Sequence, residues 1–166
     1  MPFQLTKKAN NPLLCWDIFC LKYNSLMEDA AKYNQSVTSI KQIAKINKWN
    51  KQQTLEAIEN IQQHVIIITD HLQKISFTGK GFKEMTGYSF EEAKGKNPNF
   101  LQGPITNRKK TGVLKQLLTH NESAELVLEN YRKNGEIYLC KITIKPVFNI
   151  NNRLVNYIAY EQEIAA

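Results

Sequence analysis

Three amide side chains, Asn97, Asn99 and Gln102, lie close together in a stretch that begins at Gly95. Amides donate and accept hydrogen bonds, so a short helical turn that carries them can hold a flat, partly polar ligand. The turn is bounded in the sequence, because Gly95 can take the left-handed conformation that ends a helix and Pro98 fixes its own backbone. A tight corner over a hydrophobic core can have the same composition, so this pattern leaves both interpretations open.

The residue types that covalent and metal-assisted chemistry needs are not grouped in the sequence. No nucleophile is followed by a matching base and orienting group, so we predict that the chain is not an enzyme. Cys15 and Cys20 have no Cys or His neighbours at ligand spacing, which argues against a metal site.

The bulk composition is that of a folded domain. The chain has 166 residues, of which 42% are hydrophobic and 10% aromatic, enough for one domain or for a small domain with a helical attachment. We find neither an apolar run of about 20 residues that could span a membrane nor the apolar centre of a signal peptide. Three cysteines suit a reducing compartment, so we expect a cytoplasmic protein without a membrane contact.

The net charge of +7 raises the question of nucleic-acid binding. The lysines are scattered, and residues 108–110 form the one basic run. A solvated basic surface accounts for this distribution better than a binding patch, and we therefore consider nucleic acid an unlikely partner.

The first 62 residues are expected to be helical after a loose tail of residues 1–11. Apolar residues recur at three- and four-residue steps after Pro12, and a second helix is predicted over residues 38–47 and a third from the N-cap candidate Asn50. The apolar stripe of the first helix comprises Trp16, Phe19, Cys20, Tyr23, Leu26, Met27 and Ala30. We expect these helices to cover a sheet face or a second copy of the chain in a homodimer.

Residues 39–58 also permit a helix-turn-helix interpretation. The turn lacks the usual glycine, and the second helix offers Lys51, Gln52 and Gln53 but no arginine to read guanine edges. Amphipathic helices that pack on a sheet are the simpler explanation.

From residue 64 the pattern changes to β-structure. Strands are predicted over residues 65–69, 74–77, 124–132, 137–148 and 154–164, with a capping box at Ser89 and Glu92 and a helix over residues 107–118. Two strands, short helices and three strands predict an α+β domain, in which a five-stranded antiparallel sheet carries the short helices on one face.

Three segments of this region resemble the PAS sensory domains in order and spacing. They are ISFTGKGFKEMTGYSFEEAKGKNPNFLQG, ENYRKNGEIYLCKITIKPV and VNYIAYEQEI. The resemblance covers residues 64–164 and implies a PAS domain at 63–166 after a helical extension at 1–62. Gly81-Phe82 and residues 100–103 are most similar to the light-oxygen-voltage (LOV) branch, which binds a flavin, whereas residues 95–98 are more similar to the general bacterial sensor boxes.

The LOV resemblance implies functions for individual positions. Asn97 and Gln102 match amides that contact the flavin ribityl chain, and Asn130 matches an amide at the pyrimidine edge of the ring. Pro98 stands where that family has its photoreactive cysteine. Proline has no thiolate, so the adduct chemistry of the family is not expected at this position.

The remaining positions depart from the LOV pattern. Asn99 and Lys115 match the two phosphate-binding arginines, Cys140 matches a second ring-edge amide, and Glu161 matches the glutamine that relays the signal. Three of the matched positions have a simpler alternative role. Asn130 can pair across strands, Cys140 can be a small core residue, and Glu161 faces solvent if the strand register differs by one residue.

We therefore expect a free-standing sensory module that binds a small molecule and signals through contact with an unidentified protein. The cofactor stays open: flavin is a candidate, and haem is disfavoured because His64, His71 and His120 lie outside the helix–loop region. The alternative is a PAS module without a ligand, which serves only for dimerisation or docking.

Overall fold

The computed structural model describes residues 15–165. The expected tail of residues 1–11 and the helix start at Pro12 lie outside the described residues, as does the side chain of Trp16. Contacts divide the chain into two units, Met1–Lys32 and Tyr33–Ala166. No helix among the described residues is long and apolar enough to cross a membrane.

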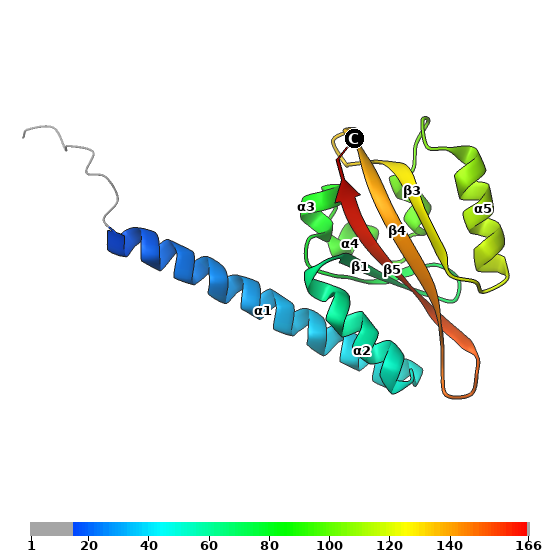
Figure 1. Cartoon of the computed structure of the whole chain (residues 1–166), viewed down its shortest axis with the longest axis horizontal. Helices are drawn as coiled ribbons and strands as arrows, with labels where there is room; N and C mark the ends of the chain where they lie inside the picture. Colours follow the sequence, from blue (N-terminus) through cyan, green and yellow to red (C-terminus); the bar gives the residue numbers. More distant parts are fainter. Residues whose placement is uncertain (1–14, 166) are drawn as a thin grey trace, which may run out of the picture. The chain divides into compact units, whose positions relative to one another are not determined.

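A five-stranded antiparallel sheet forms the centre of the second unit (Figure 1). Its strands are β1 (Val65–Asp70), β2 (Ile75–Thr78), β3 (Ala124–Tyr131), β4 (Ile137–Phe148) and β5 (Leu154–Ile164), in the order β2-β1-β5-β4-β3. The predicted fold class is confirmed. The central strands β1 and β5 bury nearly continuous runs, which agrees with the β-branched residues of β1.

Short helices lie between β2 and β3. They are α3 (Phe82–Thr86), α4 (Phe90–Ala93), the 3-10 helix η2 (Pro98–Leu101) and α5 (Arg108–Thr119). The predicted capping box is present, because Ser89 accepts from the backbone of Glu92 and Glu92 accepts from the backbone of Ser89. Gly95 has the positive φ of 74° expected after α4.

The N-terminal helices differ from the prediction. A single helix, α1 (Cys15–Asn47), replaces the two helices predicted over residues 12–30 and 38–47. Neither glycine nor proline occurs between residues 30 and 38, so the polar residues there continue the helix. The third predicted helix is present as α2 (Lys51–Glu59), capped by Asn50, and the 3-10 helix η1 (Asn60–Gln62) leads to β1.

Within the second unit, residues 33–62 cover one face of the sheet. Ile40, Trp49 and Ala57 pack in one cluster with Ile66 and Ile158. Strands alternate their side chains between faces, so the neighbours Ile67 and Ala159 point to the opposite face, where they pack near α3 and α4. Helices thus lie on both faces of the sheet, and the prediction of short helices on one face holds for the segment after β2.

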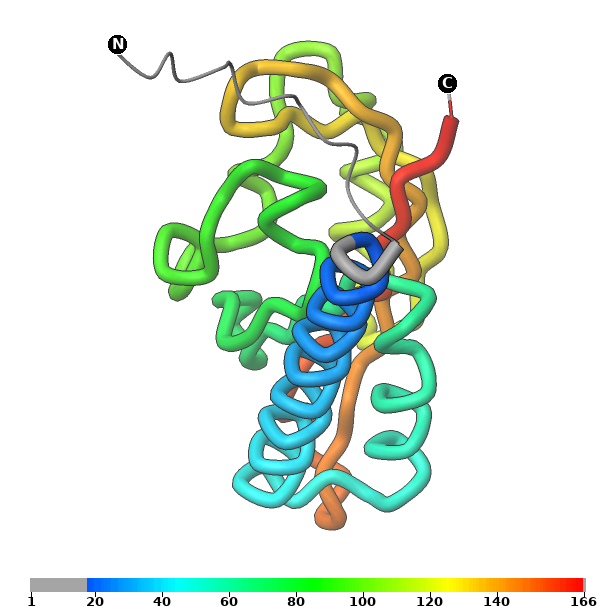
Figure 2. Tube along the Cα trace, turned by 90° about the vertical axis from the view of Figure 1, so that its left-hand side faces the viewer, coloured from blue at the N-terminus to red at the C-terminus, as the bar shows by residue number. Residues whose placement is uncertain are grey.

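Buried hydrogen bonds fasten the turn between α1 and α2 to the sheet. Trp49 donates through Nε1 to Asn156 Oδ1 at 2.9 Å, and Asn156 Nδ2 donates to the Thr69 carbonyl at 2.8 Å. The backbone of Trp49 also pairs with Asn149 at the tip of the β4–β5 hairpin, which lies beside this turn in Figure 2. The helical turn and two strands therefore form one connected structure.

Candidate functional site

An internal cavity lies between the sheet face opposite α2 and the segment from η2 to α5. Its cavity volume is about 70 Å³, within a wider space of about 620 Å³ that includes open solvent. Most of the wall is apolar, with contributions from Ile67, Leu101, Leu114, Leu118, Leu128 and Ile142.

Amide side chains surround the more exposed end of this cavity. Asn97 caps η2, because its Oδ1 accepts from the backbone N–H of Asn99 at 3.0 Å. Its Nδ2 donates to Gln73 Oε1 at 3.3 Å, and Gln102 Nε2 donates to Asn99 Oδ1 at 3.1 Å. Asn99 is exposed while the other three are partly buried. This end can therefore exchange hydrogen bonds with the polar part of a ligand.

The buried end of the cavity carries a carboxyl group. The register places Glu161 of β5 opposite Val65 of β1 and Ile142 of β4, and the side chain of Glu161, only 3% exposed, contributes to the cavity wall. Burial raises the pKa of Glu161 to about 7. Cys140 Sγ lies 3.7 Å from Glu161 Oε2, as a weak thiol donor. Near neutral pH this carboxyl can either donate or accept a hydrogen bond.

Asn130 of β3 is the second polar group in this buried part of the wall. It is 3% exposed, and among the described residues its Oδ1 has no hydrogen-bond partner. A buried amide oxygen without a partner costs free energy of about 1–3 kcal/mol, which a ligand donor would recover. The register places Asn130 opposite Tyr138 of β4, whose buried hydroxyl also has no partner by distance among the described residues. Burial raises the pKa of Tyr138, and a hydrogen bond from the Asn130 side chain acts to lower it. The cross-strand pairing considered from the sequence therefore stays open beside a ligand contact.

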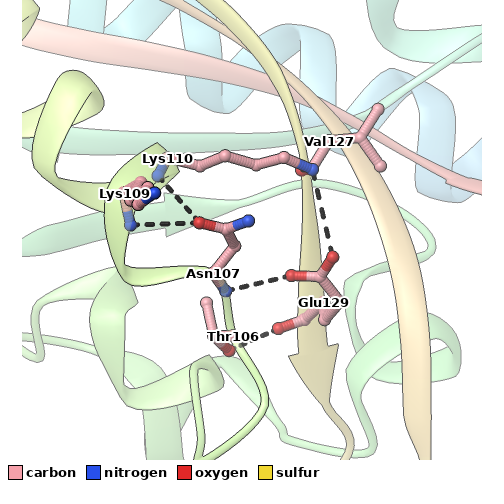
Figure 3. Close-up of polar contacts among 6 residues, drawn as sticks. All are labelled: Thr106, Asn107, Lys109, Lys110, Val127 and Glu129. Atoms are coloured by element: carbon pink, nitrogen blue, oxygen red, sulfur yellow. Dashed lines mark hydrogen bonds and ion pairs between the residues drawn. The ribbon is translucent and has the colours of Figure 1, made fainter.

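The roof of the cavity depends on the start of α5. Thr106 Oγ1 donates to the Glu129 carbonyl at 2.5 Å, and the Asn107 backbone N–H donates to Glu129 Oε2 at 3.1 Å (Figure 3). Asn107 also caps α5 by accepting from the N–H groups of Lys109 and Lys110. Since Leu114 and Leu118 of α5 line the cavity, these bonds to β3 position its apolar wall.

The loop before α5 approaches β3 closely at Gly103. A β-carbon at this position would lie 2.3 Å from the Tyr131 ring, so only glycine fits here without a shift. The backbone of Gln102 pairs with that of Asn130 in an isolated bridge. This close approach brings the exposed amide end and the buried amide into one cavity.

The structure brings together four of the six predicted site residues. Asn97, Gln102, Asn130 and Glu161 all line the cavity. Cys140 is fully buried in the hydrophobic cluster beside Glu161 and is not among the lining residues, and Lys115 is exposed on α5 away from the lining.

Sequence reasoning missed Gln73. This residue lines the cavity from the β1–β2 turn with a positive φ of 60°, and its contact with Asn97 spans 24 positions in the sequence. No local pattern pointed to it.

Pro98 occupies the first position of η2 and lines the cavity. The thiol of Cys140 lies on β4, on the sheet, and burial raises its pKa, which keeps it protonated. Groups of three or more potential metal ligands are absent from the described part of the chain.

The comparisons with known proteins agree with this architecture. The PAS domain family matches residues 62–166. The chain is 38% identical over 98 residues to a blue-light photoreceptor of Listeria innocua, which covers 57% of this chain and 39% of that protein. It is 34% identical over 114 residues to Protein TWIN LOV 1 of Arabidopsis thaliana, which covers 66% and 28%. The chain therefore matches less than half the length of either relative.

Solved structures show the same likeness. One comes from a study in which a flavin analogue sheds light on the light-oxygen-voltage domain mechanism; it has a TM-score of 0.63 and 29% identity and covers 66% of this chain and 85% of that one. The dark structure of the Aureochrome1 LOV photoreceptor gives 0.62 and 26%, with 67% and 82% covered. In fold, order of elements and sequence, this chain belongs to the PAS domain family as a LOV-like sensory module.

Proposed function

We propose that this PAS module binds a small planar ligand in the cavity and passes on its presence through contact with another protein. The observation that carries the proposal is that two buried polar side chains share one cavity wall: Asn130, whose Oδ1 accepts no hydrogen bond by distance from the described residues, and the carboxyl of Glu161. A flavin is the first candidate, because one structural neighbour concerns a flavin analogue and several relatives are named as blue-light photoreceptors. Asn97, Gln102, Asn130 and Glu161 would contact such a ligand.

The proposal includes no catalytic step in this chain. A relative named as a blue-light-activated histidine kinase is matched over only 18% of its length, so the kinase activity belongs to that protein. The free thiols of Cys20 and Cys140 support a reducing, cytoplasmic setting. The dispersed basic charge supports a function without specific nucleic-acid binding.

The test is the absorption spectrum of the purified full chain together with its native mass. We expect flavin bands, or an added mass if the ligand is colourless. Replacing Asn130 with Leu should lower ligand retention, whereas Asn151→Leu, at an exposed position in the β4–β5 turn outside the cavity lining, should not. A colourless chain without added mass would contradict the proposal.

That negative result would favour a second candidate, a docking or dimerisation module without ligand. The observation that favours it is the exposure of apolar side chains on α1. Leu21, Leu26 and Met27 are 61%, 59% and 54% exposed. A second copy of the chain is the proposed partner for these side chains.

A further inference from the structure

Glu161 is the only side chain in the described lining of the cavity that carries a charge near neutral pH. Neither lysine nor arginine is among the described lining residues. A buried anion without a matching cation is strongly disfavoured, and an ionised Glu161 adds repulsion. The electrostatics of the cavity therefore work against a phosphate or carboxylate inside it.

Two basic side chains on or directly after α5 and β3, elements that contribute to the cavity wall, are engaged in contacts within the protein. Lys110 of α5 donates to the Val127 carbonyl at 2.8 Å and lies 3.9 Å from Glu129 (Figure 3). Arg132 pairs with Glu163 at 2.6 Å and also donates to the Met85 carbonyl. Moving either cation toward a ligand would break contacts within the protein.

Two further lysines, Lys96 next to Asn97 and Lys115 away from the lining, are exposed to solvent. Lys96 is exposed, with its ammonium 5.2 Å from the centre of the Phe100 ring, and Lys115 is exposed on α5. Water and salt screen an exposed ammonium, so such a group gives weak selectivity for an anion. The polar groups at the exposed end are instead the neutral amides of Gln73, Asn97 and Gln102.

We infer that the cavity selects an electrically neutral ligand, a planar heterocycle whose polar side chain carries hydroxyl or amide groups and no phosphate. The inference rests on the proposed ligand-binding function and specifies its ligand class. Asn130 and Glu161 meet the heteroatoms of the ring, and the exposed amides meet the side chain.

The test compares riboflavin with riboflavin 5′-phosphate, which differ by the charged group alone. Fluorescence titrations of the full chain are made at about 0.02 M and about 0.3 M salt. Salt screens the attraction between exposed lysines and the phosphate more strongly at the higher concentration. At the higher salt we expect riboflavin to bind at least about tenfold more tightly than riboflavin 5′-phosphate. At the lower salt we expect a smaller difference between the two ligands. Equal or tighter binding of the phosphate at the higher salt would overturn the inference.

A charge-adding variant tests the cause. Asn99 is exposed and lines the cavity, so Asn99→Arg places a guanidinium where it can reach the phosphate. We expect about a tenfold gain for the phosphate form. The matched control Gln116→Arg adds the same charge at an exposed α5 position outside the lining, and should leave the ratio unchanged. An unchanged ratio in Asn99→Arg would overturn the inference.

Native mass spectrometry separates this inference from the proposed function. If neither flavin binds, a neutral compound that co-purifies supports the inference, and an anionic compound overturns it while ligand binding stands. Absence of both flavin binding and any co-purified compound overturns the ligand-binding function, and the inference falls with it.

Discussion

Glu161 is a carboxyl whose protonation is coupled to folding. Burial raises its pKa from 4.5 to about 7, so between these values the folded protein holds a proton that the unfolded chain releases. Glu161 therefore penalises folding progressively as the pH rises from 4.5 through about 7, by up to about 3 kcal/mol. Below pH 4.5 the carboxyl is neutral in both states and the penalty is absent.

We predict that Glu161→Gln removes this pH dependence. The amide keeps the size and polarity of the neutral acid, so the variant should match the parent at low pH and exceed its free energy of unfolding at high pH. Urea denaturation across this pH range measures the difference, with Glu122→Gln, at an exposed site, as control. Glu161→Leu should instead impair ligand retention or stability. Parallel pH curves for the parent and Glu161→Gln would contradict this account.

Pro98 leads to a prediction about photochemistry. The thiol of Cys140 is buried, protonated and directed to Glu161, so we expect no light-driven cysteinyl adduct even when flavin is bound. Pro98→Cys should introduce a thiol into the cavity wall and allow reversible bleaching of the flavin bands under illumination. If the native protein bleaches and Cys140→Ser abolishes the bleaching, Cys140 itself performs the reaction and this prediction is wrong.

Residue-level predictability depended on local spacing. Asn97, Gln102, Asn130 and Glu161 could be placed because they belong to segments that resemble the LOV pattern, and the structure brings them into one cavity. Gln73 could not, because its position at the cavity results from the packing of the β1–β2 turn against η2. Whether Lys115 or Cys140 contacts a ligand stays a prediction.

At the scale of elements, alternating patterns located the strands better than the helices. The last two strands were predicted at residues 137–148 and 154–164, as observed, because polar turns and the two-residue period mark their limits. The first helix was divided wrongly because residues 31–37 are mainly polar. A polar segment continues a helix when no glycine, proline or competing contact stops it.

The joint between the α1–α2 turn and the sheet gives a prediction at this scale. Trp49→Phe keeps most of the packing but leaves Asn156 Oδ1 without its indole donor, at a cost of about 1–3 kcal/mol in the free energy of unfolding. Urea denaturation checks this value. Ile46→Ala, at a side chain of α1 that is 69% exposed, is the control and should change stability by less than about 0.5 kcal/mol. Equal stabilities for Trp49→Phe and the parent would show that water replaces the lost bond.

At the scale of the whole molecule, the two units differ in the exposure of their apolar side chains. In Tyr33–Ala166 both sheet faces are covered, and the core clusters are buried. In Met1–Lys32 the described side chains Ile18, Leu21 and Leu26 are each more than half exposed. Adjacent exposed apolar groups of this kind indicate an interaction surface. The domain boundary predicted at 62/63 stays a prediction. By contacts, residues 33–62 belong to the same compact unit as the sheet.

We predict that the full chain is a homodimer and that a chain beginning at Tyr33 is a monomer that keeps its fold. Burial of these apolar side chains between two copies would supply the free energy of association, at about 25 cal/mol per Å² of apolar surface. Light scattering over a range of concentrations measures the mass of each chain. Leu26→Glu should weaken the full-length dimer, because it places a charge among the apolar side chains, whereas Glu28→Gln should preserve it. A full chain that stays monomeric at high concentration would exclude self-association, and the exposed apolar side chains of α1 would then need a partner other than a second copy.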